Sequence, residues 1–116
     1  MLKIRFDPTG RIMDDRVIVE PPYELVANFI VRDIQASPTG ARNCVRMLRA
    51  VIDGTGPPIE QETGNMWTMD ADPTWTTLTN DYGHPTLSVR VPTPWLLDAI
   101  ERWHAYLIER GVPSDQ

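Results

Sequence analysis

The side chains that could carry acid–base, nucleophilic or metal chemistry are few in this chain of 116 residues. His84 and His104 are the only histidines, and Cys44 is the only cysteine. None of them has the C-x-x-C or H-E-x-x-H spacing of a zinc site. No serine lies in a G-x-S-x-G turn, and no glycine-rich phosphate loop is present. This inventory predicts a protein that is not an enzyme and that uses no metal or cofactor.

Three aspartates form a concentrated group of ionisable side chains. Asp70 and Asp72 belong to one predicted hairpin loop, and Asp81 belongs to the next. Carboxylates in such loops serve as solvated turn residues, as partner contacts, or as metal and acid–base groups. Trp75 and Tyr82 flank these loops, and partly exposed aromatic residues are common binding hot spots. These five residues are therefore the candidate partner-binding site.

The net charge of -5 lies entirely in the second half of the chain. Residues 1–60 hold eight basic and eight acidic residues, whereas residues 61–116 hold three basic and eight acidic ones. An acidic surface argues against direct nucleic-acid binding, because phosphates require a positive patch. It favours a basic protein partner, with plain solubility as the alternative.

A basic stripe is expected on the first-half helix that holds the cysteine. Arg42, Arg46 and Arg49 have the i, i+4, i+7 spacing of one helix face. The stripe could meet phosphate or an acidic protein, or it could be the solvated back of the helix. Asp53 lies four residues after Arg49 and would partly neutralise it.

The single cysteine and the N-terminal residues bear on the compartment. Cys44 cannot form an intrachain disulfide and is expected to be a small buried apolar residue, which fits a reducing compartment. The charged start of the chain does not resemble a secretory signal, and no apolar run reaches the length of a membrane span. A cytoplasmic location is the expectation.

The first half predicts a hairpin followed by two helices. Leu2–Phe6 and Arg16–Val19 read as strands, because apolar residues alternate or run together in short segments. One helix should begin near Pro22 and end around Ala36. A second should run over 38–53, with Ser37 as its N-cap and a glycine just beyond its end.

The second half predicts three short strands and a helix. Gly64–Met69, Trp75–Thr79 and Leu87–Val91 carry the alternating pattern of strands. The last helix should open with Thr93 as N-cap, run to Arg110 and stop at Gly111.

Together these elements predict a single α+β domain over residues 1–116. It contains an antiparallel sheet of about five strands, made by the N-terminal hairpin and a C-terminal three-stranded meander. Two central helices and the C-terminal helix pack on one face. One sheet containing all five strands is an arrangement that the pattern allows, and the strand order is not readable. The predicted core comprises Phe29, Ile30, Leu48, Ile52, Trp67, Leu78, Leu96, Ile100, Trp103 and Leu107.

One stretch resembles a known family. Gly64-Asn65, an apolar strand, a short acidic turn, another strand and the segment Val91–Trp103 resemble immunity proteins of bacterial contact-dependent growth inhibition systems, over about residues 61–110. The resemblance implies a small, acidic, cytoplasmic and catalytically silent protein. Such a protein binds a cognate toxin domain, often a basic tRNA or DNA nuclease, and blocks its active site.

Two other classes of function remain open at this point. A non-catalytic regulatory module could form a homodimer through an exposed edge strand, either Leu2–Phe6 or Leu87–Val91. An enzyme would have to rely on His84 or Asp81.

Overall fold

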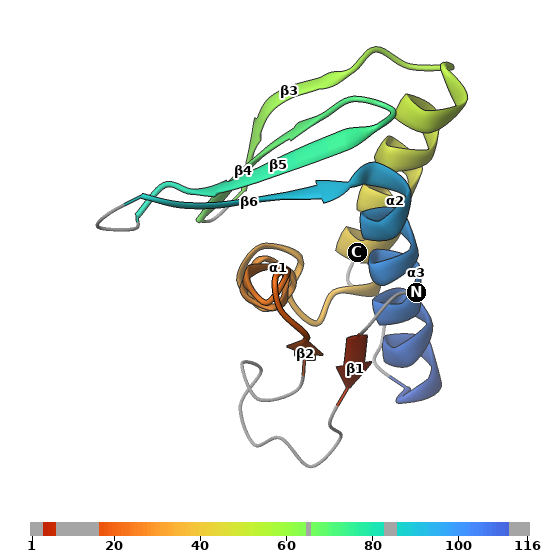
Figure 1. Ribbon diagram of the computed structural model, residues 1–116. Coiled ribbons are helices and arrows are strands. Elements are labelled where there is room, and N and C mark those ends of the chain that lie inside the picture. Colours follow the sequence, from red (N-terminus) through yellow and green to blue (C-terminus); the bar gives the residue numbers. More distant parts are fainter. Residues whose placement is uncertain (1–3, 7–16, 65, 83–85, 112–116) are drawn as a thin grey trace.

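The computed structural model describes residues 4–6, 17–64, 66–82 and 86–111, which form an α+β fold (Figure 1). Strands β1 (Ile4–Phe6) and β2 (Val17–Val19) form a small antiparallel pair. Helix α1 (Leu25–Phe29) continues directly into the π-helix η2 (Ile30–Ile34). The segment Asp7–Gly10, whose proline and glycine are typical of a turn, lies outside the described residues.

The rest of the chain supplies the main sheet and a pair of long helices. Helix α2 spans Pro38–Asp53, and helix α3 spans Thr93–Glu109. Between them lie the four strands of the main sheet, which are β3 (Ile59–Thr63), β4 (Trp67–Ala71), β5 (Trp75–Asn80) and β6 (Leu87–Pro92). They form an antiparallel sheet in the order β3-β4-β5-β6.

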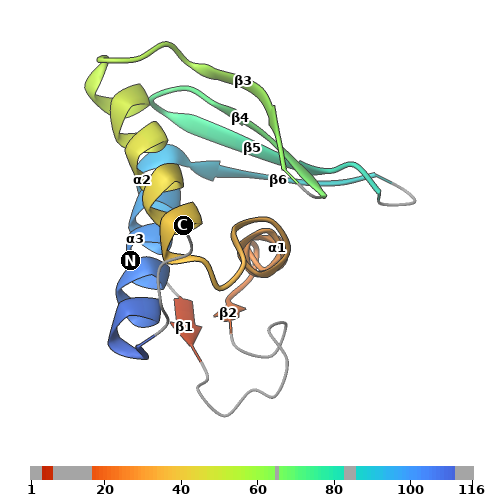
Figure 2. The ribbon, with the colours of Figure 1, turned by 180° about the vertical axis from the view of Figure 1, so that it is seen from behind.

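The helices lie to one side of this sheet. Helices α2 and α3 pack side by side next to the end of the sheet where β6 runs into α3, and α1 lies under β6 (Figures 1 and 2). The opposite end of the β5–β6 pair extends away from the helices. The predicted α+β class, with helices packed against an antiparallel sheet, is confirmed.

Three details of the predicted strands are wrong. Strand β3 was not predicted, and Gly64 and Met66, which were assigned to a strand, precede β4 rather than belong to it. The hairpin β1–β2 forms its own two-stranded sheet, so the strands do not join into one. Residues Glu60–Thr63 are exposed, which explains why no buried face marked β3 in advance.

The first predicted helix is also different in kind. It begins at Leu25 rather than near Pro22, and its second half is a π-helix in which the Gln35 N–H donates to the Ile30 carbonyl at 2.7 Å. The turn ends at Gln35, whose φ of 62° stops further helix. Three apolar side chains of this turn, those of Ile30, Val31 and Ile34, pack into the core and hold it in place.

Helix α2 follows its local signals closely. The Ser37 hydroxyl accepts a hydrogen bond from the Gly40 N–H at 2.9 Å, and Pro38 occupies the first turn. Gly54 ends the helix with φ of 74°, a conformation that favours glycine. The predicted N-cap and C-terminal glycine are both confirmed.

Helix α3 begins differently from the prediction. Its N-cap position is Pro92, and the Thr93 side chain makes no cap. The buried Thr93 hydroxyl instead donates to the Asp72 carbonyl at 2.7 Å and lies 2.8 Å from the Thr76 hydroxyl oxygen. The start of α3 is thereby tied to the β4–β5 loop.

The core fills the space between the helices and the inner face of the main sheet. Trp67 and Trp103 are fully buried, and their indole N–H groups donate to Asn28 Oδ1 at 2.9 Å and to the Gln35 carbonyl at 2.8 Å. Every predicted core residue is buried except Ile52, which is half-buried. Val51, the residue before it, is buried together with Cys44 and Leu48 on the inward side of α2.

Candidate functional site

The main sheet has one face on the core and one open face, here called the outer face. Alternate side chains along β4 and β5 are buried, and the residues between them are at least partly exposed. Among the described parts of the chain, no helix or strand covers this second face (Figure 1). By strand register it carries Thr63, Thr68, Asp70, Trp75, Thr77, Thr79, Ser88 and Arg90.

A hollow of about 340 Å³ lies on the outer face, close to where β6 joins α3. Asp70 and Trp75 of the candidate site line it, together with Glu60 of β3 and Arg90 of β6. The Arg90 guanidinium lies over the Trp75 ring, with Cζ 4.3 Å from the ring centroid. This geometry is a cation–π contact.

Asp72 is held rigidly at the rim of this hollow. Its Oδ1 accepts hydrogen bonds from the backbone N–H groups of Thr74 and Trp75, both at 2.8 Å. These two hydrogen bonds hold the pKa of the Asp72 carboxyl below its usual value, and the bond from Trp75 has the larger effect. The positive charge of Arg90 lowers this pKa further. The carboxylate is therefore ionised and fixed in direction.

Asp70 is held by a neighbouring strand. Its Oδ1 accepts from the Gln61 N–H at 2.9 Å, at the irregularity where β3 departs from regular pairing. Gln61 has φ of 54° there, so the bulge in β3 turns its N–H towards the carboxylate.

Asp81 lies at the other end of β5. Trp75 begins this strand of six residues, so the two ends of β5 lie roughly 17 Å apart. The Asp81 Oδ2 accepts from the Thr68 hydroxyl at 2.7 Å, and that hydroxyl lies 3.1 Å from the Thr63 hydroxyl oxygen. Asp81 thus touches the outer face through Thr68, which lies two residues before Asp70 on the same strand.

Tyr82 also lies at this far end. Its side chain is 66% exposed, and its backbone N–H donates to Asn80 Oδ1 at 2.9 Å. Leu87, which pairs with Asn80 across the hairpin, is 43% exposed. The five predicted residues therefore form two groups along one sheet, with Asp70, Asp72 and Trp75 at the end near the helices and Asp81 and Tyr82 at the other end.

Two residues of the site were missed by the sequence reasoning. Arg90 and Glu60 line the hollow, yet neither was a candidate. The alternation Leu87–Val91 does place Arg90 on the face opposite to Val91. Only the register, in which Thr77 pairs with both Asp70 and Arg90, brings it to the acidic loop.

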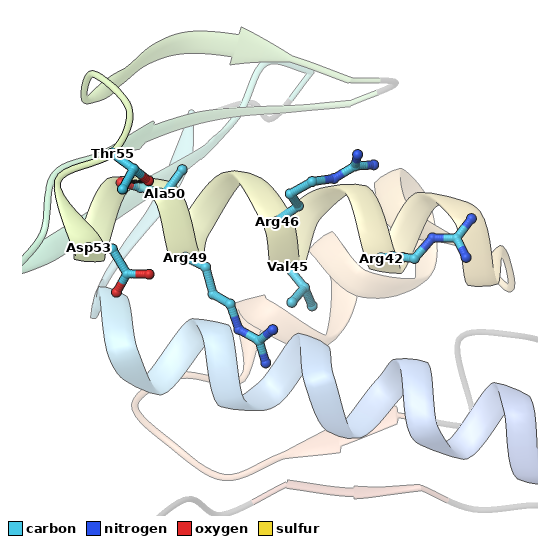
Figure 3. A pocket seen from close by; sticks show the side chains of 7 residues that line it. All are labelled: Arg42, Val45, Arg46, Arg49, Ala50, Asp53 and Thr55. Carbon is cyan, nitrogen blue, oxygen red and sulfur yellow. Dashed lines mark hydrogen bonds between the residues drawn. The ribbon is translucent and has the colours of Figure 1, made fainter.

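The basic stripe of α2 forms a second, separate surface (Figure 3). A hollow of about 640 Å³ runs along it, lined by Arg42, Arg46 and Arg49. Arg49 forms an ion pair with Glu101 of α3 rather than with Asp53. Such surface pairs contribute little, so the stripe is largely a solvated helix face.

The potentially reactive side chains in the described part of the chain form no metal-binding group. Across the described residues, no group of three or more His, Cys, Asp and Glu side chains could hold a metal ion. Burial raises the pKa of the Cys44 thiol to about 12, which leaves it protonated and unreactive at neutral pH. His104 is half-buried on α3, and His84 lies outside the described residues.

None of the described helices combines the length and apolar character needed to cross a membrane. No protein-family model, curated protein or solved structure matches the chain. Inferences about function therefore depend on the geometry of the outer face.

Proposed function

We propose that this chain is an immunity protein that binds a cognate bacterial toxin and neutralises it by masking the toxin's active site. The toxin would be a basic nuclease domain of a contact-dependent growth inhibition system. The observation that carries the proposal is the outer face of the main sheet, where an exposed tryptophan lies among fixed carboxylates and no described element covers it.

The chemistry of this face supports binding rather than reaction. Asp70 and Asp72 each direct one oxygen to backbone N–H groups, so their positions are set before a partner arrives. A surface that is already ordered loses less conformational entropy on binding. Carboxylates at fixed positions can take the place of substrate phosphates in the basic cleft of a nuclease.

The extent of the face supports a protein partner. Asp70 lies on the outer face of β4, and Asp81 is tied to the same face by its hydrogen bond from Thr68. Charges spread along a surface steer a basic partner into position and raise the rate of association by about tenfold or more. Tyr82, at the far end, adds exposed aromatic area of the kind that anchors interfaces.

The test uses the C-terminal domain of the protein encoded by the neighbouring reading frame. That domain, induced alone in a bacterial host, should stop growth, and co-expression of this chain should restore growth. The purified pair should form a complex whose association slows as salt is raised. Growth arrest that persists in the presence of the folded chain would contradict the proposal.

Charge variants test the assigned surface. The double variant Asp70→Asn, Asp81→Asn should slow association about tenfold or more at low salt, because it removes the steering charges. The double variant Asp53→Asn, Glu109→Gln is the matched control, since it removes two exposed carboxylates from α2 and α3, away from the outer face. Equal association rates for the two variants would remove the outer face from the interface.

A second candidate function follows from the edge strand β6. One edge of the main sheet, β3, is blunted by its bulge and by Glu60 and Glu62, whereas β6 presents an exposed Leu87. A homodimeric regulatory module would pair two β6 strands across a two-fold axis. Light scattering over a dilution series tests this, and Leu87→Lys should abolish such a dimer while leaving a monomeric immunity protein unaffected.

A further inference from the structure

The hollow on the outer face has unbalanced charge. Glu60, Asp70 and Asp72 line it with three carboxylates, and Arg90 supplies one guanidinium, which leaves two negative charges among the lining residues. Its volume of about 340 Å³ is at the small end of the range for ligand pockets. The space therefore suits a group of side-chain size that carries positive charge.

Arg90 lies against the aromatic wall of this hollow, and its charge acts on Asp72 without a direct ion pair. The guanidinium lies 4.3 Å from the centroid of the Trp75 ring. Within the described chain it forms no ion pair with Asp70 or Asp72, since the ion pairs found there involve other residues. The exposed side chain of Arg90 is therefore held mainly by the ring.

The carboxylates of Asp70 and Asp72 line the hollow and each keep one oxygen that could accept hydrogen bonds from a ligand. Asp70 and Asp72 each use Oδ1 for backbone N–H groups. Their Oδ2 atoms accept no hydrogen bond from any described residue. Carboxylate oxygens beside an aromatic face match a guanidinium, which offers a planar fork of N–H donors and a flat surface for stacking.

We propose that this hollow is a socket for one arginine side chain of the protein partner. Arg90 holds the place of that arginine on the Trp75 ring in the unbound protein and leaves the ring when the partner binds. This inference rests on the proposed function, because it names the chemistry by which the same surface recognises its partner. Arg90 is then a competitor within the site rather than a partner contact.

The proposal predicts that one substitution on this surface strengthens binding rather than weakens it. Arg90→Gln removes both the competing guanidinium and a repelling positive charge, so it should strengthen binding of an arginine ligand. Trp75→Ala removes the stacking surface and should weaken it. Asp70→Asn removes a charged acceptor and should weaken it as well.

The test needs no identified partner. The probe is a blocked peptide of alternating glycine and arginine, with lysine and citrulline versions as controls. The chain has four tryptophans, and the indole N–H signal of Trp75 in ¹H–¹⁵N spectra is identified by its loss in Trp75→Phe. The arginine peptide should shift this signal, and the citrulline peptide, which has the same shape without charge, should not.

Affinities of the variants for the arginine peptide complete the test. Arg90→Gln should bind about two- to fivefold more tightly than the unsubstituted protein, the range expected for release of an exposed cation–π contact. The matched control Arg46→Gln, which removes an exposed arginine from α2, should bind unchanged. Equal or weaker binding by Arg90→Gln would overturn the inference, and so would an equal response to the citrulline peptide.

Two further outcomes have defined meanings. A lysine peptide that binds as tightly as the arginine peptide would overturn the assignment of a guanidinium socket. Peptide binding with the expected variant pattern, together with failure to restore growth against the toxin domain, would refute the proposed function and leave the socket standing. Restored growth without a shift of the Trp75 signal by the arginine peptide would refute the socket and leave the proposed function standing.

Discussion

Trp67 and Trp75 belong to neighbouring strands of one sheet, and their surroundings differ in kind. Trp67 points inward, is 1% exposed and packs edge-on against Phe29 with ring centroids 6.4 Å apart. Its indole N–H is satisfied by Asn28. Trp75 points outward, is 36% exposed and lies against the Arg90 guanidinium rather than the core.

The carboxylates of the chain divide in the same way. Asp33 of η2 directs both oxygens to the start of β4, accepting from the Met66 N–H at 2.9 Å and the Trp67 N–H at 3.2 Å. Asp70 directs only one oxygen to the backbone and leaves the other on the outer face. The Asp33 carboxylate thus uses both oxygens within the fold, whereas the Asp70 carboxylate keeps one for the partner that we propose. Substitutions should separate accordingly into effects on stability and effects on binding.

The largest loss of stability is expected from a substitution on the inner face of the main sheet. Leu78 is fully buried on β5, and Leu78→Ala should lower the free energy of unfolding by about 2–5 kcal/mol through lost burial and the cavity left behind. Thr79→Ala, the adjacent position on the outer face, is the matched control and should change it by about 0.5 kcal/mol or less. Urea denaturation measures both. Similar losses for the two variants would break the distinction between the faces.

The next effect tests the structural carboxylate. A Cβ on Gly64 would lie 2.3 Å from Asp33 Oδ2, closer than any real contact. Gly64→Ala should therefore displace the carboxylate from its two N–H partners and lower the free energy of unfolding by about 1–3 kcal/mol.

A double-mutant cycle shows whether this loss acts through Asp33. After Asp33→Ala the nearest remaining atom of that residue is its Cβ, 3.5 Å from the added Cβ of residue 64, so Gly64→Ala should then have a much smaller effect. Additive losses in the cycle would show that the backbone of Gly64, rather than the Asp33 carboxylate, determines the effect.

Local signals account for the parts of the fold that the sequence predicted well. Ser37, Pro38 and Gly54 mark the ends of α2 because capping and turn chemistry involve only nearby backbone groups. Strand β5 was predicted within one residue because its inner positions alternate with polar ones. In both cases the deciding interactions lie within a few residues of each other.

The parts that were missed depend on distant contacts. Strand β3 consists largely of exposed residues and exists because it pairs with β4, so no periodic pattern marks it. The π-helix η2 depends on core packing and on the positive φ of Gln35, neither of which has a local signature. The separation of the hairpin β1–β2 from the main sheet is likewise set by tertiary packing.

The candidate site was predicted in its residue types but not in its arrangement. Turn chemistry and composition pointed to Trp75, Asp72 and Asp81, whereas Asp70, which was predicted in the loop, lies in β4. Their division into two ends follows from the length of β5, and the contact between Arg90 and Trp75 follows from the β5–β6 register. Register cannot be read from one sequence, because neighbouring strands specify it jointly.

A smaller effect on stability is expected at the outer tryptophan. Trp75→Ala should lower the free energy of unfolding by about 1 kcal/mol or less, since it removes one exposed cation–π contact and a partly exposed ring. Trp67→Ala, its inner counterpart, should cost about 3–5 kcal/mol. Thermal and urea denaturation compare the pair, and a loss at Trp75 that approaches the loss at Trp67 would make it a core residue rather than a binding residue.

The smallest expected effect is a dependence of the protein's stability on the protonation of Asp72, at the rim of the hollow. Backbone N–H groups of Trp75 and Thr74 lower the pKa of Asp72 from its ordinary value of 3.8, so the folded protein binds this proton less readily than the unfolded chain does. The resulting stabilisation is fully present above pH 3.8 and is lost as the pH falls through the lower pKa of the folded state. Asp72→Asn cannot titrate, so the stability difference between the two proteins should shrink as the pH is lowered below that value. Urea denaturation at a series of acidic pH values measures the difference. A difference that stayed constant across the series would show that the two backbone hydrogen bonds, and not the ionised carboxylate, set the conformation of the loop that carries Trp75.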